Sequence, residues 1–101
     1  MVVRDRPDAT ILTVSGELDV ASSPQLRAAL DRIDPSPARR VVLDLSGLSF
    51  IDVTGLSLLL RAQQRALRRR SRLILINVPE ALRRLLRLTG STELLDSIQE
   101  G

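Results

Sequence analysis

A threonine hydroxyl with an acidic neighbour is the first candidate among the residues whose types and spacing could do chemistry. Thr54 lies in the segment Asp52-Val53-Thr54-Gly55, where a leucine-rich predicted helix begins. The first N–H groups of a helix lack partners and its dipole favours negative charge there, so a phosphate on Thr54 would be held at modest cost. Gly55 lets another backbone approach closely and gives a kinase access to the hydroxyl. The segment therefore predicts a phosphoacceptor, beside an Asp52 carboxylate that would repel the added charge.

The same four residues have a second interpretation, as an ordinary helix start. Asp52 or Thr54 would then be the N-cap, a role worth about 1 kcal/mol. A cap is the commoner use of such residues, and Thr54 could serve as both cap and phosphoacceptor. The segment alone leaves these alternatives open.

The chain lacks most of the side chains that enzymes use for catalysis. The sequence has no Cys, His, Tyr or Lys, which excludes thiol chemistry and removes the usual metal ligand and general base. Neither a P-loop nor a Gly-rich phosphate cradle is present. Asp19 and Asp52 could form a carboxylate pair, but a small domain offers little enclosed pocket for a substrate. We therefore expect a protein that is not an enzyme and uses no cofactor or metal.

The charge pattern allows a nucleic-acid interpretation that other features oppose. All 15 basic residues are Arg, against 12 acidic ones, and several gather in two predicted helices and just after the first of them: Arg61, Arg65, Arg68, Arg69, Arg70, Arg72, Arg83, Arg84 and Arg87. Such a stripe could contact phosphates. Phe50 is the single aromatic residue, however, so bases would have no stacking platform. A solvated helix face or a rim for an acidic protein partner is the expected role, without nucleic acid.

Nothing in the sequence predicts export or membrane insertion. The chain begins Met1-Val2-Val3-Arg4-Asp5 without an apolar leader, and its longest apolar candidate, 56–60, is far too short to span a bilayer. We expect a soluble, cytoplasmic protein that does not contact a membrane.

The elements that must position Thr54 alternate between strands and helices. Apolar and β-branched runs predict strands at 10–15, ended by Gly16, at 41–45, covered on both faces, and at 72–76, with an edge strand at 1–4. The first helix is expected to begin at a Ser cap at 22–24 and to have an apolar face of Leu26, Ala29, Leu30 and Ile33. A second helix is expected from 54–55 to about 69, and a third after the loop at 77–80, with Gly90 as its C-cap. A short final helix is expected within 93–99. The segment 34–37 stops the first helix. A connection at 46–52 turns Phe50 and Ile51 inward.

This order predicts one α/β domain over residues 1–101, with a mostly parallel sheet and crossover helices. Functional groups gather beyond the carboxyl ends of the strands in such sheets. Three loops fit that position, at 16–19, 46–55 and 77–80. Two of them carry closely spaced acidic and hydroxyl groups, which makes this edge the expected site.

An ordered set of motifs resembles the STAS domain family, which includes bacterial anti-sigma factor antagonists. The set runs over most of the chain: Gly16-Glu17-Leu18-Asp19, Leu43-Asp44-Leu45-Ser46, Phe50 to Leu56, Asn77, and Leu88-Thr89-Gly90. Each tetrapeptide is weak alone, but the set in this order is specific. The resemblance implies a single STAS-like domain with a mostly parallel or mixed sheet of roughly four to five strands.

Partner switching is the function that the resemblance implies. The unmodified protein would bind an anti-sigma factor that is also a serine/threonine kinase and so release the sigma factor. Phosphorylation at Thr54 would abolish that binding, and a serine/threonine phosphatase would restore it. The implied partner-binding residues are Glu17, Asp19, Asp52, Val53, Thr54, Gly55 and Ser57.

Two departures from the family pattern bear on this expectation. Val53 stands where many relatives carry a second hydroxyl residue, which leaves Thr54 as the single strong phosphoacceptor of the motif. The sequence ends soon after Ile98, so the last helix is expected to be short or frayed. An alternative within the same fold is a STAS regulatory or scaffold subunit that is never phosphorylated, as in a lipid ABC transporter or a stress-signalling complex.

Overall fold

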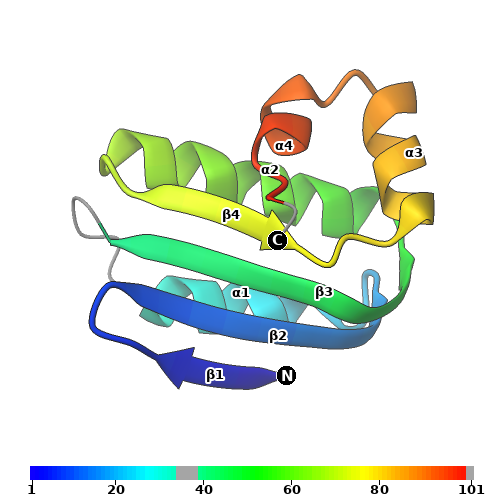
Figure 1. Cartoon of the computed structure of the whole chain (residues 1–101). Coiled ribbons are helices and arrows are strands. Elements are labelled where there is room, and N and C mark those ends of the chain that lie inside the picture. Colours follow the sequence, from blue (N-terminus) through cyan, green and yellow to red (C-terminus); the bar gives the residue numbers. More distant parts are fainter. Residues whose placement is uncertain (34–38, 100–101) are drawn as a thin grey trace.

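The computed structural model describes residues 1–33 and 39–99 and has two layers, a sheet and the helices that cover one of its faces (Figure 1). The elements in chain order are β1 (Val2–Asp5), β2 (Ala9–Leu18), α1 (Ser23–Arg32), β3 (Arg40–Ile51), α2 (Val53–Arg68), β4 (Arg72–Ile76), α3 (Glu80–Leu88) and α4 (Thr92–Asp96). The predicted α/β class and the predicted alternation of elements are confirmed. The expected stop of the first helix at 34–37 lies outside the described residues.

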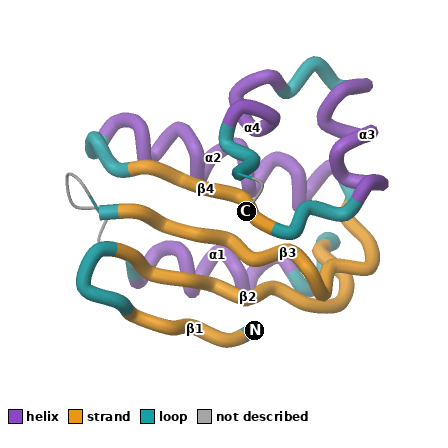
Figure 2. Tube along the Cα trace, in the orientation of Figure 1, coloured by secondary structure: helices purple, strands orange, loops and turns teal. Residues whose placement is uncertain are grey.

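The sheet has the strand order β1-β2-β3-β4, with β1 antiparallel at one edge and the other pairs parallel. Both crossover connections step across the sheet in the same direction. Because such crossovers are right-handed, α1 and α2 lie on the same face, behind the strands in Figure 1. Figure 2 shows α3 and α4 gathered beyond the β4 edge, where Leu75 also pairs with Ile98.

An aliphatic core fills the space between the sheet and its helices. Alternate residues of β3, namely Val41, Leu43 and Leu45, are buried and pack with Leu26 of α1 and Leu59 of α2. Their spacing of two is the period that turns one face of a strand inward.

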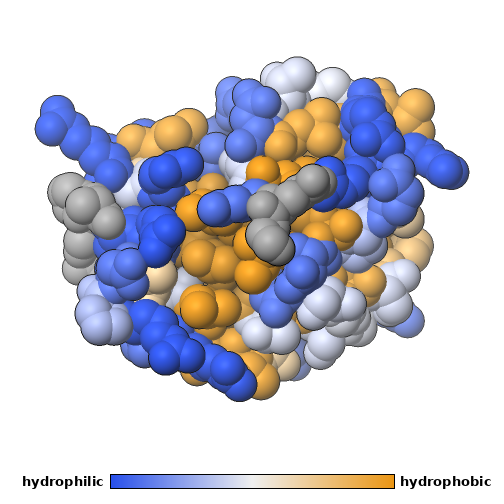
Figure 3. Space-filling view, in the orientation of Figure 1, coloured by the Kyte–Doolittle hydropathy of each residue, from blue (hydrophilic) through white to orange (hydrophobic). Residues whose placement is uncertain are grey.

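The expectation that the 41–45 strand is covered on both faces is wrong. Val42 and Asp44 lie on the other face and are only partly buried, because no described helix crosses over it. Apolar surface shows through the middle of this open face, with hydrophilic residues around it (Figure 3).

Two predicted strands end too early, and one glycine explains both errors. Gly16 was expected to end the first strand, but β2 continues to Leu18 with Gly16 at a φ of +79°. The ladder with β3 shifts register on either side of that point, as it does where a glycine accommodates a bulge. Because β2 continues, β3 has a partner as far as Ile51, so the expected connection at 46–52 is strand up to Ile51.

The helix ends follow the sequence signals more closely. Gly90 has a φ of +69° after α3, where the N–H of Ser91 bonds to the carbonyl of Leu86 at 2.9 Å and that of Gly90 to Arg87 at 3.2 Å. These two bonds form the Schellman pattern that satisfies the last carbonyls of a helix. The final helix is short as expected, and Ser97 to Gln99 leave it to run beside β4.

Candidate functional site

The carboxyl ends of β2 and β3 bring two of the three predicted loops together. Leu18 and Ile51 are paired at the end of the ladder, and the N–H of Asp52 donates to the carbonyl of Leu18 at 3.2 Å. Asp19 and Asp52 therefore follow neighbouring strand ends. The third loop is held elsewhere: the Asn77 amide donates to Asp44 Oδ1 at 3.1 Å.

Asp19 organises the turn between β2 and α1. Its Oδ1 accepts from the N–H groups of Ala21 and Ser22, each at 3.0 Å, and from the Ser22 hydroxyl at 3.1 Å. The Ser22 N–H and hydroxyl, followed by the Ala21 N–H, hold the pKa of Asp19 below its usual value. Asp19 is thus a carboxylate at neutral pH.

The sequence correctly placed a serine at the start of α1 but assigned its hydroxyl the wrong role. Ser22 occupies the N-cap position without a side-chain cap bond. Its hydroxyl shares its single proton between the carbonyl of Glu17, at 2.6 Å, and Asp19 Oδ1, and it accepts from the N–H of Asp19 at 3.0 Å. Ser22 therefore ties the end of β2 to the Asp19 turn, which fixes the backbone of this loop.

Asp52 is the N-cap of α2, which decides between Asp52 and Thr54 for that role. Its Oδ1 accepts from the N–H of Gly55 at 3.0 Å, and its carbonyl accepts from Leu56 at 2.9 Å. Thr54 is exposed, and its hydroxyl has no hydrogen-bond partner within the described part of the chain. The Thr54 hydroxyl therefore takes no part in the described hydrogen bonds that hold the start of α2.

Gly55 seats α2 against the end of β2. A Cβ at this buried position would lie 2.6 Å from the Leu18 carbonyl oxygen and 2.9 Å from Ile51 Cγ1. The predicted close approach of another backbone is confirmed, and it occurs inside the protein. Gly55 therefore positions its neighbour Thr54 beside the Asp19 turn.

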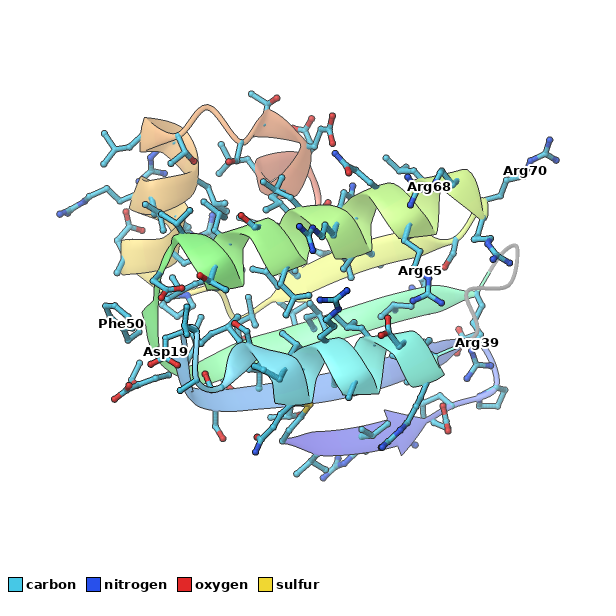
Figure 4. The ribbon with its side chains drawn as sticks, turned by 180° about the vertical axis from the view of Figure 1, so that it is seen from behind. Asp19, Arg39, Phe50, Arg65, Arg68 and Arg70 are labelled. Carbon is cyan, nitrogen blue, oxygen red and sulfur yellow. The ribbon has the colours of Figure 1, made fainter. Side chains whose placement is uncertain are left out.

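Three large apolar side chains are exposed at the strand ends and helix start that flank Thr54. Val20 is 70%, Phe50 53% and Val53 73% exposed, at the end of β2, the end of β3 and the start of α2. Figure 4 shows Phe50 and Asp19 at the same end of the molecule. We call the following residues the Thr54 edge: Glu17, Asp19, Val20, Phe50, Val53 and Thr54.

Sequence reasoning missed Val20 and turned Phe50 the wrong way. Ile51 is partly buried against the core, as expected, but Phe50 points outward. Leu48 and Ile51 both turn inward although they are three residues apart, so the alternation of a regular strand is broken between them. The available signal was the position of a lone aromatic residue directly before the Asp52 segment.

The remaining predicted site residues occupy supporting positions. Ser57 is partly buried one turn after Thr54, on the side of α2 that faces α1. Asp52 is partly buried and its Oδ1 is used by the cap. Neither side chain belongs to the outermost surface of the Thr54 edge.

Part of the arginine set of the rival nucleic-acid interpretation lies away from the Thr54 edge, together with Arg39, whereas Arg61 lines a cleft with Thr54. Arg39, Arg65, Arg68 and Arg70 gather at the opposite end of the molecule from Asp19 (Figure 4). Arg65 pairs with Asp31 at 3.1 Å, and Arg39 with Asp5 at the same distance. Several of these side chains thus sit in exposed ion pairs, as a solvated surface would place them.

Neither a metal-ligand cluster nor a membrane-spanning helix occurs among the described residues. No cluster of three or more side chains of the metal-binding types occurs among them. Over residues 1–33 and 39–99, none of the helices has the length and apolar character to cross a bilayer.

Comparison with known proteins places the chain in a family. The profile described as "Mlab, STAS domain" matches residues 1–96. This chain belongs to the STAS domain family. The anti-sigma-B factor antagonist of Staphylococcus aureus is 30% identical to this STAS domain over 88 residues, which cover 87% of the chain and 81% of the relative. The Listeria monocytogenes protein of the same name is 29% identical over 83 residues, 82% of the chain and 73% of the relative.

A solved structure agrees with this assignment. The crystal structure of an anti-sigma factor antagonist from Mycobacterium paratuberculosis superposes with a TM-score of 0.76 at 25% identity, covering 98% of this STAS domain and 81% of that chain. The four-stranded mixed sheet and its helices are therefore the fold of the family.

Proposed function

We propose that this STAS domain is an anti-sigma factor antagonist that switches partners through Thr54. The observation that carries the proposal is the exposed Thr54 hydroxyl, which has no partner among the described residues and lines one cleft with exposed Val20 and Val53. Exposed Phe50 lies at the same end of the molecule as Asp19 (Figure 4). The names of the Staphylococcus and Listeria relatives support the same role.

The unmodified Thr54 edge offers a surface of the kind that protein partners bind. Exposed apolar side chains that gather in one place commonly mark interaction sites, and interfaces combine an apolar centre with a polar rim. Val20, Phe50 and Val53 would form the centre, and the carboxylates of Glu17 and Asp19 would form an acidic rim. The partner, an anti-sigma factor that is also a serine/threonine kinase, would then present an apolar patch with basic residues beside it.

Phosphorylation would end this binding by placing charge in the apolar centre. The γ-phosphoryl group of ATP passes to Thr54 Oγ1, ADP leaves, and the hydroxyl proton goes to a base of the kinase. The new group carries about −1.5 to −2 charges, and its desolvation between Val53 and an apolar partner surface is unfavourable. A phosphatase that hydrolyses the ester would restore the hydroxyl.

The proposed role is one of binding and not of catalysis. The sequence has no His, Cys or Lys to activate a nucleophile. The proposal includes no nucleic-acid or membrane contact, and it assigns the protein to the cytoplasm, where sigma factors and ATP are present.

Incubation with a candidate anti-sigma kinase and ATP tests the modification. We expect one phosphoryl group per chain, mapped by mass spectrometry to Thr54 and absent from Thr54→Ala. Phe50→Ser is the companion variant for docking: because Phe50 is exposed, its loss should weaken kinase binding without lowering the melting temperature. Phosphate on another residue, or undiminished binding by Phe50→Ser, would contradict the assigned surface.

A STAS subunit that is never phosphorylated remains the second candidate. The profile that matches the chain carries the name Mlab beside STAS, which supports a regulatory or scaffold subunit as the second candidate. If no candidate kinase modifies Thr54 while a stable complex forms through the Thr54 edge, the subunit role replaces the switch.

A further inference from the structure

A cleft beside Thr54 separates the amino-terminal halves of α1 and α2. Its volume is about 410 Å³, and Thr54, Ser57 and Arg61 line one wall. Ser23 and Arg27 of α1 line the other. The candidate phosphoacceptor and two guanidinium groups therefore border the same space.

Both arginines of the cleft are available to bind an anion. Arg27 and Arg61 are exposed, and neither forms an ion pair with any described carboxylate. Arg65, one turn further along α2, is by contrast paired with Asp31. The α1 wall also holds the Ser23 Oγ, which is buried without a hydrogen-bond partner among the described residues.

Helix geometry directs Arg61 towards Thr54. The two residues are seven apart, so they lie on the same face of α2 with about 10.5 Å between them along the axis. Side chains of a helix lean towards its amino terminus, which brings the Arg61 guanidinium back in the direction of Thr54. An extended arginine and a phosphothreonine together span this distance.

The cap of α2 makes these arginines important for any phosphate on Thr54. A phosphate at a helix start is ordinarily held by the free N–H groups of the first turn. Here Asp52 already occupies the N–H of Gly55 and adds a negative charge two residues from Thr54. Asp19 adds a second carboxylate at the same end of the molecule. Arg27 and Arg61 are the cations that face the cleft against these two carboxylates.

We propose that Arg27 and Arg61 form a clamp for the phosphoryl group of phospho-Thr54. This inference rests on the proposed function, because it requires a phosphate at Thr54. The clamp draws the phosphate into the cleft between α1 and α2 and offsets its repulsion by Asp52. Phosphorylation then rearranges the cleft wall in addition to placing charge on the Thr54 edge.

Titration of the phosphate by ³¹P NMR tests the clamp. Phosphothreonine is installed at position 54 of the full chain by genetic-code expansion, so no kinase is needed. The second pKa of such a phosphate is ordinarily about 6, and nearby cations lower it. We expect a pKa in the wild-type sequence that is lower by about half a unit or more than in the double variant Arg27→Gln/Arg61→Gln.

Arg32→Gln/Arg68→Gln is the matched control, because it removes one positive charge from α1 and one from α2 at exposed positions that do not line the cleft. It should leave the phosphate pKa at the wild-type value, and thermal melts should show all variants folded. Equal pKa values in the wild type and in Arg27→Gln/Arg61→Gln would overturn the clamp, as would an equal shift in Arg32→Gln/Arg68→Gln. Failure of the partner switch appears as absent modification or binding by the kinase and leaves this titration unchanged.

Discussion

Replacing Gly55 with alanine measures how tightly the start of α2 is seated on β2. The added Cβ would lie 2.6 Å from the Leu18 carbonyl oxygen, 2.8 Å from Leu18 Cγ and 2.9 Å from Ile51 Cγ1. The closest of these atoms belongs to the backbone. The same carbonyl accepts the hydrogen bond from Asp52 N–H at 3.2 Å. Relief of the clash must therefore move the helix away from the strand end and lengthen that bond.

The expected cost follows from two opposing terms. Overpacking of a tight interior site costs about 1–3 kcal/mol. Alanine recovers roughly 0.5–1 kcal/mol relative to glycine within a helix, because it restricts the unfolded chain and favours helical geometry. Because the nearest atom belongs to the backbone, the overpacking cost lies in the upper part of its range, at about 2–3 kcal/mol. The net loss for Gly55→Ala is then about 1–2.5 kcal/mol, which for a domain of this size corresponds to a fall of roughly 4–20 °C in melting temperature.

Thermal and urea denaturation followed by circular dichroism measure this loss. Gln64→Ala is the control on an exposed turn of the same helix, and its stability should change by no more than about 0.5 kcal/mol. A melting temperature of Gly55→Ala equal to or above that of the wild type would refute the close seating of α2 on Leu18.

Two further predictions concern the capping and charge contacts. Asp52→Ala should lower the free energy of unfolding by about 1 kcal/mol, because it removes the cap bond to Gly55. Thr54→Ala should lower it by only a few tenths, because its hydroxyl has no described partner; equal losses in urea titrations would contradict the assignment of the cap. Asn77→Gly keeps the positive φ of 54° and removes the amide that chiefly holds the pKa of Asp44 below 3.8, so NMR titration should show that pKa rise. A carboxyl group whose pKa is lowered in the folded state stabilises the fold at pH values above its unfolded pKa. The stability difference between the wild type and Asn77→Gly should therefore be full at neutral pH and shrink as the pH falls below 3.8. A difference that persists undiminished in acid would assign the loss to another cause.

The sequence predicted the parallel strands of the sheet and the placement of Asp19 and Asp52 at one of its edges, because these depend on patterns with a regular period. The apolar runs at 41–45 and 72–76 identified two parallel strands, and the helical spacing from Leu26 to Ile33 identified the buried face of α1. The alternation of elements then placed Asp19 and Asp52 at one edge of the sheet. These inferences needed only local spacing and the general rules of parallel sheets.

The errors arose where the outcome depends on contacts between distant segments. Gly16 is a strand terminator by its local preference, yet the pairing of β2 with β3 carries both strands past it. The outward turn of Phe50 follows from the broken alternation in that extended pairing. The choice of Asp52 over Thr54 as the cap likewise depends on side-chain geometry at the strand ends, which spacing along the chain does not specify.

Binding of an anti-sigma factor kinase to the wild type, Thr54→Ala and Thr54→Glu tests the central claim most directly. Isothermal titration calorimetry with each purified protein gives the three affinities, and melting curves confirm that each is folded. Thr54→Ala should bind as tightly as the wild type, because the alanine leaves the apolar centre of the Thr54 edge uncharged. Thr54→Glu should lose most of its affinity, because its carboxylate must be desolvated beside Val53. Equal binding by the two variants would contradict the switch at Thr54 and leave the fold unaffected.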